Sequence, residues 1–219
     1  METHKVKYDL EKFPFHELVK KHFKWHRNLK YLNEWLRDDV PLIKELKYDQ
    51  STEFHRKFYT IYNESTDFLD LYTRFLKEVV QPCYDEPLVY QAKPSFRIHL
   101  PNNIAVGEWH KDGDYNHQRS EINWWIPFTD AFDTNTIWCE SEEDKGDFEA
   151  KEVKHGEALV FGGAYLTHGN KSNDTGFCRV SVDFRVIPHS EYRESQDCSS
   201  NMKIKFKINQ VYFWMIIIK

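Results

Sequence analysis

A histidine and an aspartate, His110 and Asp112, are separated by a single residue in the segment AVGEWHKDGDYNHQRSEINWWIP. On an extended strand, residues i and i+2 point to the same side, so this imidazole and this carboxylate can bind one divalent metal ion together. A third ligand must come from elsewhere, and His168 in the segment LTHGN is the natural candidate. Two imidazoles and one carboxylate suit Fe(II) and leave coordination positions open.

The segment FCRVSVDFRVIP, which follows His168, alternates apolar and polar residues. This period predicts a strand with one apolar and one polar face. The polar face carries Arg179, Ser181, Asp183 and Arg185. If the apolar face packs against covering elements, the polar face lines a cavity, where Arg179 and Ser181 can bind a carboxylate. Arg185 is expected to contribute mainly to stability.

The His-x-Asp pair by itself is a weak signal. Turn residues follow Asp112, and a polar loop after a strand would have the same composition. The metal interpretation gains its support from His168 and from the Arg-x-Ser pattern that comes after it.

The order of these residues resembles that of the Fe(II)/2-oxoglutarate-dependent oxygenases. The motif of that family is His-x-Asp, a distant His and then Arg-x-Ser on a strand, and it is matched by His110, Asp112, His168, Arg179 and Ser181. The segments EINWWIPFTDAFDTNTIWCES, HGEALVFGGAYLTHGN and CRVSVDFRVIP resemble the branch associated with streptomycin biosynthesis and, more distantly, phytanoyl-CoA-type hydroxylases. The resemblance covers residues 94 to 188.

The resemblance implies a set of cofactors and an activity. His110, Asp112 and His168 would bind Fe(II) as the catalytic centre, and 2-oxoglutarate would chelate the metal while its distal carboxylate binds Arg179 and Ser181. The reaction would consume O2, release succinate and CO2, and hydroxylate a C–H bond of the substrate. The streptomycin-associated branch points to a small polar metabolite, such as a sugar or an aminocyclitol, although a fold does not fix a substrate.

Two other functions stay open from the residues alone. A metal-dependent cupin that hydrolyses or isomerises sugars with Zn or Mn would use the same three ligands, but it would not need Arg179 and Ser181 on the cavity face. A jelly-roll binding module without catalysis is the second alternative. The complete set of three ligands argues against a site that has decayed.

Short strands separated by turn residues predict a mainly β fold with some helix from residue 94 to 187: a double-stranded β-helix, that is, a cupin-like jelly roll. In INWWI, strand parity places Asn123 and Trp125 toward the cavity, and the resemblance implies that both contact the cosubstrate. Other residues that could contact the substrate are Arg97, His99, Tyr115, His117 and Glu121. A solvent-facing edge strand is an equally good interpretation for Arg97 and His99, and His117 is expected to face water.

The N-terminal part of the chain, residues 1 to 85, has helical spacing of its apolar residues and is predicted to form helices packed on the outside of the jelly roll. Residues 8 to 36 are expected to form helix with breaks, and residues 51 to 82 one long helix. The jelly-roll core is predicted at 88 to 190, followed by a C-terminal extension at 191 to 219. The terminal VYFWMIIIK is too short to span a bilayer and is predicted as a strand that adds to the sheet; the alternative is an exposed, aggregation-prone apolar tail.

Composition limits the remaining possibilities. With 219 residues, of which 40% are hydrophobic, the chain is expected to form a single domain. The net charge is −5 and basic residues are mixed with acidic ones, so we expect a small-molecule partner rather than nucleic acid or a membrane. Four dispersed cysteines and an N-terminus without an apolar segment favour the cytoplasm, with Cys139 and Cys178 as buried thiols. The sequence does not indicate an oligomeric state.

Overall fold

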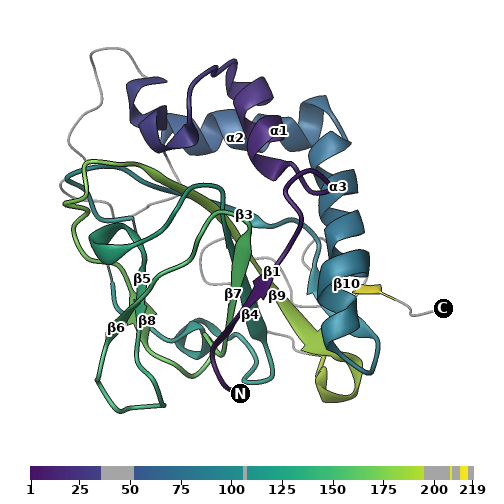
Figure 1. Ribbon diagram of the computed structural model, residues 1–219. Coiled ribbons are helices and arrows are strands. Elements are labelled where there is room, and N and C mark those ends of the chain that lie inside the picture. Colours follow the sequence, from purple (N-terminus) through teal and green to yellow (C-terminus); the bar gives the residue numbers. More distant parts are fainter. Residues whose placement is uncertain (36–51, 106–107, 195–207, 209–212, 217–219) are drawn as a thin grey trace.

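The computed structural model describes residues 1–35, 52–105, 108–194, 208 and 213–216 (Figure 1). Within these ranges ten strands form two antiparallel sheets. The strands are β1 His4–Lys7, β2 Leu88–Gln91, β3 Ser95–His99, β4 Ile122–Pro127, β5 Ile137–Cys139, β6 Glu149–Lys151, β7 Glu157–Phe161, β8 His168–Gly169, β9 Arg179–Pro188 and β10 Phe213–Ile216.

The large sheet has the order β1-β7-β4-β9-β2-β10, with β3 also paired to β9. The small sheet has the order β6-β5-β8. Strand β9 is the longest strand and pairs with three others. Strands β2 and β3 pair with successive parts of β9, and β4 also pairs with it. This arrangement is the double-stranded β-helix that the sequence predicts.

Helices cover one side of the large sheet (Figure 1). They are α1 Phe15–Phe23, α2 Glu53–Glu64 and α3 Asp67–Phe75, with the 3-10 helix η1 Leu29–Trp35; α3 continues as a π-helix over Leu76–Val80 and a 3-10 turn over Gln81–Cys83. The core between helices and sheet is rich in aromatic rings. Phe58 of α2 stacks on Phe96 of β3 with 4.1 Å between ring centroids, and stacked rings of this kind add to the stability gained from buried area.

Strand β9 alternates as predicted from its sequence. Val180, Val182 and Phe184 are buried in the core that the helices cover. Their polar neighbours therefore point to the other side, toward the small sheet. A second apolar cluster lies on that side and includes Trp125, Leu159, Phe161 and Cys139. The large sheet thus has an apolar face toward the helices and a mixed face toward the small sheet.

The prediction of one long helix over residues 51 to 82 is wrong. The chain leaves the helical conformation at Ser65, whose φ of −155° and ψ of 149° are extended, and α3 starts anew at Asp67. Two hydroxyl side chains favour the break: Ser65 Oγ accepts a hydrogen bond from the amide of Asp67, and Thr66 donates one to Asp70. Such local bonds compete with helix continuation.

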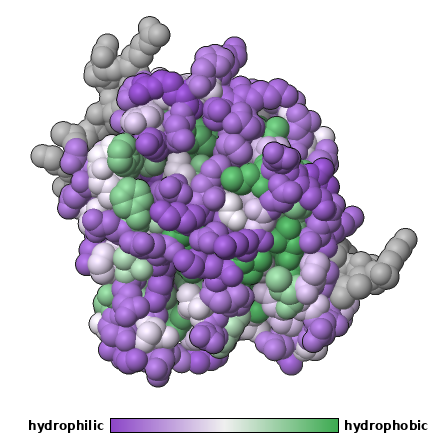
Figure 2. Space-filling view, in the orientation of Figure 1, coloured by the Kyte–Doolittle hydropathy of each residue, from purple (hydrophilic) through white to green (hydrophobic). Residues whose placement is uncertain are grey.

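The C-terminal strand is confirmed, since β10 pairs antiparallel with β2. Cys139 and Cys178 are buried free thiols, as expected, whereas Cys198 lies outside the described residues. No helix in the described ranges is long and apolar enough to cross a membrane. In Figure 2 hydrophobic residues show mainly in the middle of the visible face, between the helical part and the sheet part, and hydrophilic residues cover most of the rest.

His55 on α2 allows a test of this helix–sheet core. Its side chain is buried, and burial, aided by the charge of Arg97, lowers its pKa to about 3. As the pH falls below roughly 6.5, the unfolded chain binds a proton that the folded protein excludes, so the free energy of unfolding falls by up to about 1.4 kcal/mol per pH unit. In His55→Gln we expect a smaller loss of stability between about pH 7 and pH 5, by roughly 2 kcal/mol.

Urea denaturation at the two pH values measures this difference. The matched control is His26→Gln, because the His26 side chain is exposed; it should lose as much stability on acidification as the wild type. An equal pH dependence in His55→Gln and the wild type would contradict the burial argument.

Candidate metal centre

The two histidines of the predicted triad face each other across an antiparallel bridge. His110 donates its amide to the carbonyl of His168 at 3.0 Å, and the amide of His168 donates to the carbonyl of His110 at 3.0 Å. Opposed residues on antiparallel strands carry their side chains on the same face. The two imidazole rings therefore lie side by side, with 4.6 Å between their centroids.

Asp112 reaches the same point from a different backbone conformation. The prediction that it shares an extended strand with His110 is wrong, because Asp112 begins a 3-10 helix, η4 Asp112–Tyr115. Its amide donates to the carbonyl of Gly163 at 2.8 Å, and the amide of Gly113 donates to Ala164 at 3.1 Å. The loop that leads to His168 thus also fixes the main chain at Asp112.

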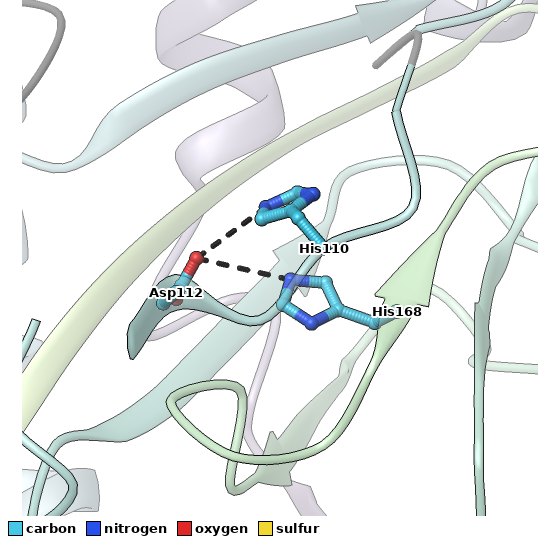
Figure 3. A group of neighbouring side chains, drawn as sticks. All are labelled: His110, Asp112 and His168. Carbon is cyan, nitrogen blue, oxygen red and sulfur yellow. Dashed lines mark ion pairs between the residues drawn. The ribbon is translucent and has the colours of Figure 1, made fainter. Parts of the chain in front are cut away.

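The three side chains converge (Figure 3). One ligand atom from each of His110, Asp112 and His168 lies within 4.8 Å of the others, and among the described residues these are the ones grouped closely enough to hold a metal ion. Asp112 Oδ1 is 3.5 Å from His110 Nε2 and 3.9 Å from His168 Nε2. In Figure 3 both rings point toward this oxygen from their separate chain segments.

The far nitrogen of each ring is held by the backbone. His110 Nδ1 lies 2.9 Å from the carbonyl of Glu108, and His168 Nδ1 lies 3.0 Å from that of Leu166. A carbonyl only accepts, so each Nδ1 carries the proton and each Nε2 offers its lone pair to the centre. Metal-bound histidines commonly have this outer hydrogen bond. The donor set fits a divalent transition metal.

The other oxygen of Asp112 is occupied by protein donors. Asp112 Oδ2 accepts a hydrogen bond from Asn123 Nδ2 at 2.7 Å and from Arg185 Nε and Nη2 at 3.0 and 2.8 Å. Burial alone would raise the pKa of Asp112, but the Arg185 charge and the neighbouring histidines hold this pKa well below its usual range. Asp112 is therefore ionised, as a metal ligand must be. Arg185, which the sequence analysis expects to act mainly on stability, contacts the central carboxylate directly.

The histidines differ in their electrostatic surroundings. Burial lowers the pKa of His168, and the charge of Asp112 offsets only part of this effect. Burial also acts to lower the pKa of His110, but its interaction with Asp112 outweighs burial and raises it. The lowered pKa of His168 favours the neutral ring that a metal ion requires. The raised pKa of His110 means that a metal ion must compete with a proton for this ring.

Arg179 lies on the same face of β9 as Arg185 and is 2% exposed. Its Nη1 donates to Ser181 Oγ at 2.9 Å and its Nη2 to Asn170 Oδ1 at 2.8 Å. Trp125 Nε1 donates to the same Ser181 hydroxyl at 3.0 Å, and its ring lies 5.2 Å below the guanidinium. The structure brings Arg179, Ser181 and Trp125 together, while Asn123 lies at the metal end beside Asp112.

The further residues singled out from the sequence fall into two groups. Arg97 and His99 are opposite Ser181 and Arg179 in the β3–β9 register, and among the described strands β3 pairs with β9 alone. His99 is buried and Arg97 is partly buried, so the alternative of a solvent-facing edge strand is wrong for His99. Burial lowers the pKa of His99 to about 3, and the nearby Arg179 charge acts in the same direction. His117 does not face water: its Nδ1 lies 2.7 Å from Glu121 Oε2. Tyr115 packs edge-on against His110.

Sequence reasoning missed several residues at this face. Asn170 and Asn135 each bind Arg179, the first through its side chain and the second through its carbonyl. Asp183 binds Arg97 Nε at 2.8 Å and lies 3.5 Å from Arg185. Strand parity had already placed Asp183 on the polar face of β9, without a partner assigned to it. Asn170 follows β8 in a loop, and Asn135 ends the short 3-10 helix η5 Asp133–Asn135. Neither position has a strand period that indicates the direction of its side chain.

StrG of Streptomyces griseus, described as a streptomycin biosynthesis protein, is 38% identical to this chain over 167 residues, covering 76% of this chain and 77% of StrG. The chain belongs to the StrG family. No family model matches the sequence. The resemblance of the sequence to the branch associated with streptomycin biosynthesis is confirmed.

Three solved structures have folds similar to that of this chain. The nickel complex of ThoJ, a non-heme monooxygenase, has a TM-score of 0.50 and 14% identity, covering 89% of this chain and 76% of ThoJ. The apo form of EctD from S. alaskensis has a TM-score of 0.50 and 12% identity, covering 94% and 80%. SnoK, a non-heme alpha ketoglutarate dependent carbocyclase, has a TM-score of 0.50 and 10% identity, covering 99% and 92%. At these identities the likeness shows a shared fold.

Gly113 permits the close approach of the Asp112 and His168 segments. A Cβ at this position would lie 2.6 Å from the backbone oxygen of Ala164. In Gly113→Ala the loop carrying His168 must therefore move away, and we expect the affinity for Co(II) to fall by ~10-fold or more, as when supporting groups of a metal site are lost. Isothermal titration calorimetry measures this Co(II) affinity.

Gly176→Ala is the matched control. Gly176 has a φ of 73° with open space around it, so alanine costs about 1 kcal/mol of backbone strain but leaves the triad in place. Equal Co(II) affinities in the two variants would contradict the role of Gly113.

Proposed function

We propose that this protein is a non-haem Fe(II)- and 2-oxoglutarate-dependent dioxygenase that hydroxylates a small polar metabolite. The observation that carries the proposal is the convergence of two Nε2 atoms and one carboxylate oxygen within 4.8 Å, on the same side of the fold as a buried arginine. Two imidazoles and a carboxylate are the ligand set of Fe(II) oxygenases. Fold and family both support this assignment.

His110, Asp112 and His168 would hold the metal ion. Each histidine is oriented by a backbone carbonyl on its Nδ1, and Asp112 is oriented through its Oδ2. Three ligands from one side leave the opposite side of the ion open for cosubstrate and oxygen. With Fe(II) and 2-oxoglutarate bound, the centre would supply the oxidising chemistry, with succinate and CO2 as by-products.

Arg179 and Ser181 would bind the distal carboxylate of 2-oxoglutarate. Ser181 Oγ already accepts hydrogen bonds from Arg179 and Trp125, so its hydroxyl can meet a carboxylate only as a donor. The permanent charge of the guanidinium and its planar fork suit a carboxylate. Trp125 and the neutral His99 enclose this end of the site, and the exclusion of water strengthens a charged contact.

The substrate class is the finer part of the proposal. The name of StrG associates that relative with streptomycin biosynthesis, and this supports a sugar or aminocyclitol-like substrate here. A panel of such compounds, assayed for stimulated succinate release, tests the class. A metal-dependent isomerase or hydrolase, the main alternative, would act on sugars without consuming 2-oxoglutarate.

The metal and cosubstrate assignment is tested without a known substrate. Anaerobic addition of Fe(II) and 2-oxoglutarate to the wild type should produce a weak visible charge-transfer band, because the cosubstrate chelates the ion. In His168→Ala we expect the band and stoichiometric iron binding to be lost while the circular dichroism spectrum is retained. The exposed His26→Ala serves as the control. A folded His168→Ala protein that binds iron with wild-type affinity would contradict the proposal.

Arg179 separates this function from that of other metal jelly rolls. Loss of a bidentate, desolvated contact costs roughly 2 to 5 kcal/mol, which is about thirty-fold or more in affinity. We expect Arg179→Ala to raise the 2-oxoglutarate concentration for half-maximal succinate release by at least that factor, with iron binding near normal. Arg179→Lys should be nearly as impaired, because it keeps the charge but not the fork.

Arg56→Ala, on the exposed side of α2, is the control for this titration. A wild-type 2-oxoglutarate requirement in both Arg179 variants would show that another group binds the distal carboxylate.

A further inference from the structure

Asp112 has two oxygens in unequal surroundings. Oδ1 faces the two histidine Nε2 atoms at 3.5 and 3.9 Å. Oδ2 accepts three hydrogen bonds, one from Asn123 and two from Arg185. One carboxylate oxygen offers about two lone-pair sites, so three donors saturate Oδ2.

From this asymmetry we propose that Arg185 is a positioning residue: together with Asn123 it ties up Oδ2, so that Asp112 presents Oδ1 alone to the metal ion. The proposal rests on the metal centre proposed above. A carboxylate that binds through one oxygen occupies one coordination position, whereas one that binds through both takes a second position. Arg185 would thereby keep that position open for the cosubstrate or oxygen.

Arg185 is itself fixed on several sides. Its Nη1 lies 3.4 Å from Gln91 Oε1 and 3.5 Å from Asp183 Oδ2, and its Nε lies 3.8 Å from Glu121 Oε2. Asp183 is in turn bound by Arg97. Because Arg185 is 7% exposed, these contacts hold its planar fork in one orientation. A guanidinium held in this way can orient a ligand more firmly than a flexible ammonium can.

Asn123 is held in a matching way. An ionised Oδ2 requires a donor, so the amide nitrogen of Asn123 must face it. The backbone of Gly163 backs the other side of this amide, since a Cβ there would lie 2.6 Å from Asn123 Nδ2. The Asn123 amide therefore cannot swing away from Asp112 without displacing the loop.

Charge and geometry predict opposite results when Arg185 is removed. Its positive charge repels a nearby cation, so if charge alone mattered, a neutral residue would tighten metal binding. If Arg185 positions Oδ1, its loss frees the carboxylate to turn or to chelate, and binding weakens. The sign of the change in metal affinity distinguishes the two.

The experiment uses Co(II) alone, with isothermal titration for the affinity and the visible absorption bands for the coordination geometry. In Arg185→Met we expect Co(II) affinity to fall ~10- to 100-fold, the usual effect of losing a group that supports a metal ligand, and the bands at saturating Co(II) to change shape. Arg185→Lys, which keeps the charge and offers a second chance of a folded protein, should recover only part of the affinity. The control is Arg56→Met, an exposed arginine on α2 outside this network; we expect its Co(II) affinity to stay within about twofold of the wild type.

Three outcomes overturn the inference. They are unchanged or tighter Co(II) binding in Arg185→Met, full recovery in Arg185→Lys, or unaltered Co(II) bands in both variants. Failure of the proposed function is separate, since it would appear as wild-type protein that binds Co(II) but never converts 2-oxoglutarate. Wild-type protein that binds no Co(II) would overturn both.

Discussion

The ion pair between Asp112 and Arg185 is the interaction on which the candidate site depends. A carboxylate that is 3% exposed is costly to keep ionised unless donors replace the lost water. Arg185 and Asn123 supply those donors on one oxygen, and the second oxygen is thereby directed at the histidines. The charge of Arg185 is the largest of the interactions that hold the pKa of Asp112 below its usual range against the effect of burial.

Strand β9 links the two ends of the site. Arg185 lies at the metal end, and Arg179 lies at the end proposed to bind the distal carboxylate of 2-oxoglutarate. Both arginines are on the face of β9 opposite Val180, Val182 and Phe184. The apolar face is anchored by the helices, so the polar face cannot rotate. The aromatic core on one side of the sheet thus fixes the register of charged groups on the other.

The loop before β8 has a similar double role. It leads into His168, the first residue of β8, and its backbone carbonyls at Gly163 and Ala164 accept hydrogen bonds from the amides of Asp112 and Gly113. One short segment therefore sets both the third ligand and the conformation of the carboxylate segment. This explains why two stretches far apart in the chain can form a centre with atoms less than 5 Å apart.

The sequence by itself determined the family and the alternation of β9, and it predicted the three candidate ligands and the pair Arg179 and Ser181. Strand parity and motif order are local properties of the chain. The sequence could not determine that Asp112 starts a 3-10 helix, that the helix breaks at Ser65, or that Arg185 turns onto Asp112 rather than merely stabilising the strand. Those features depend on contacts between segments distant in sequence, such as Asp112 with Gly163 and Arg185 with Asp112. Only tertiary packing decides them, since a buried charge must find its partner wherever the fold places one.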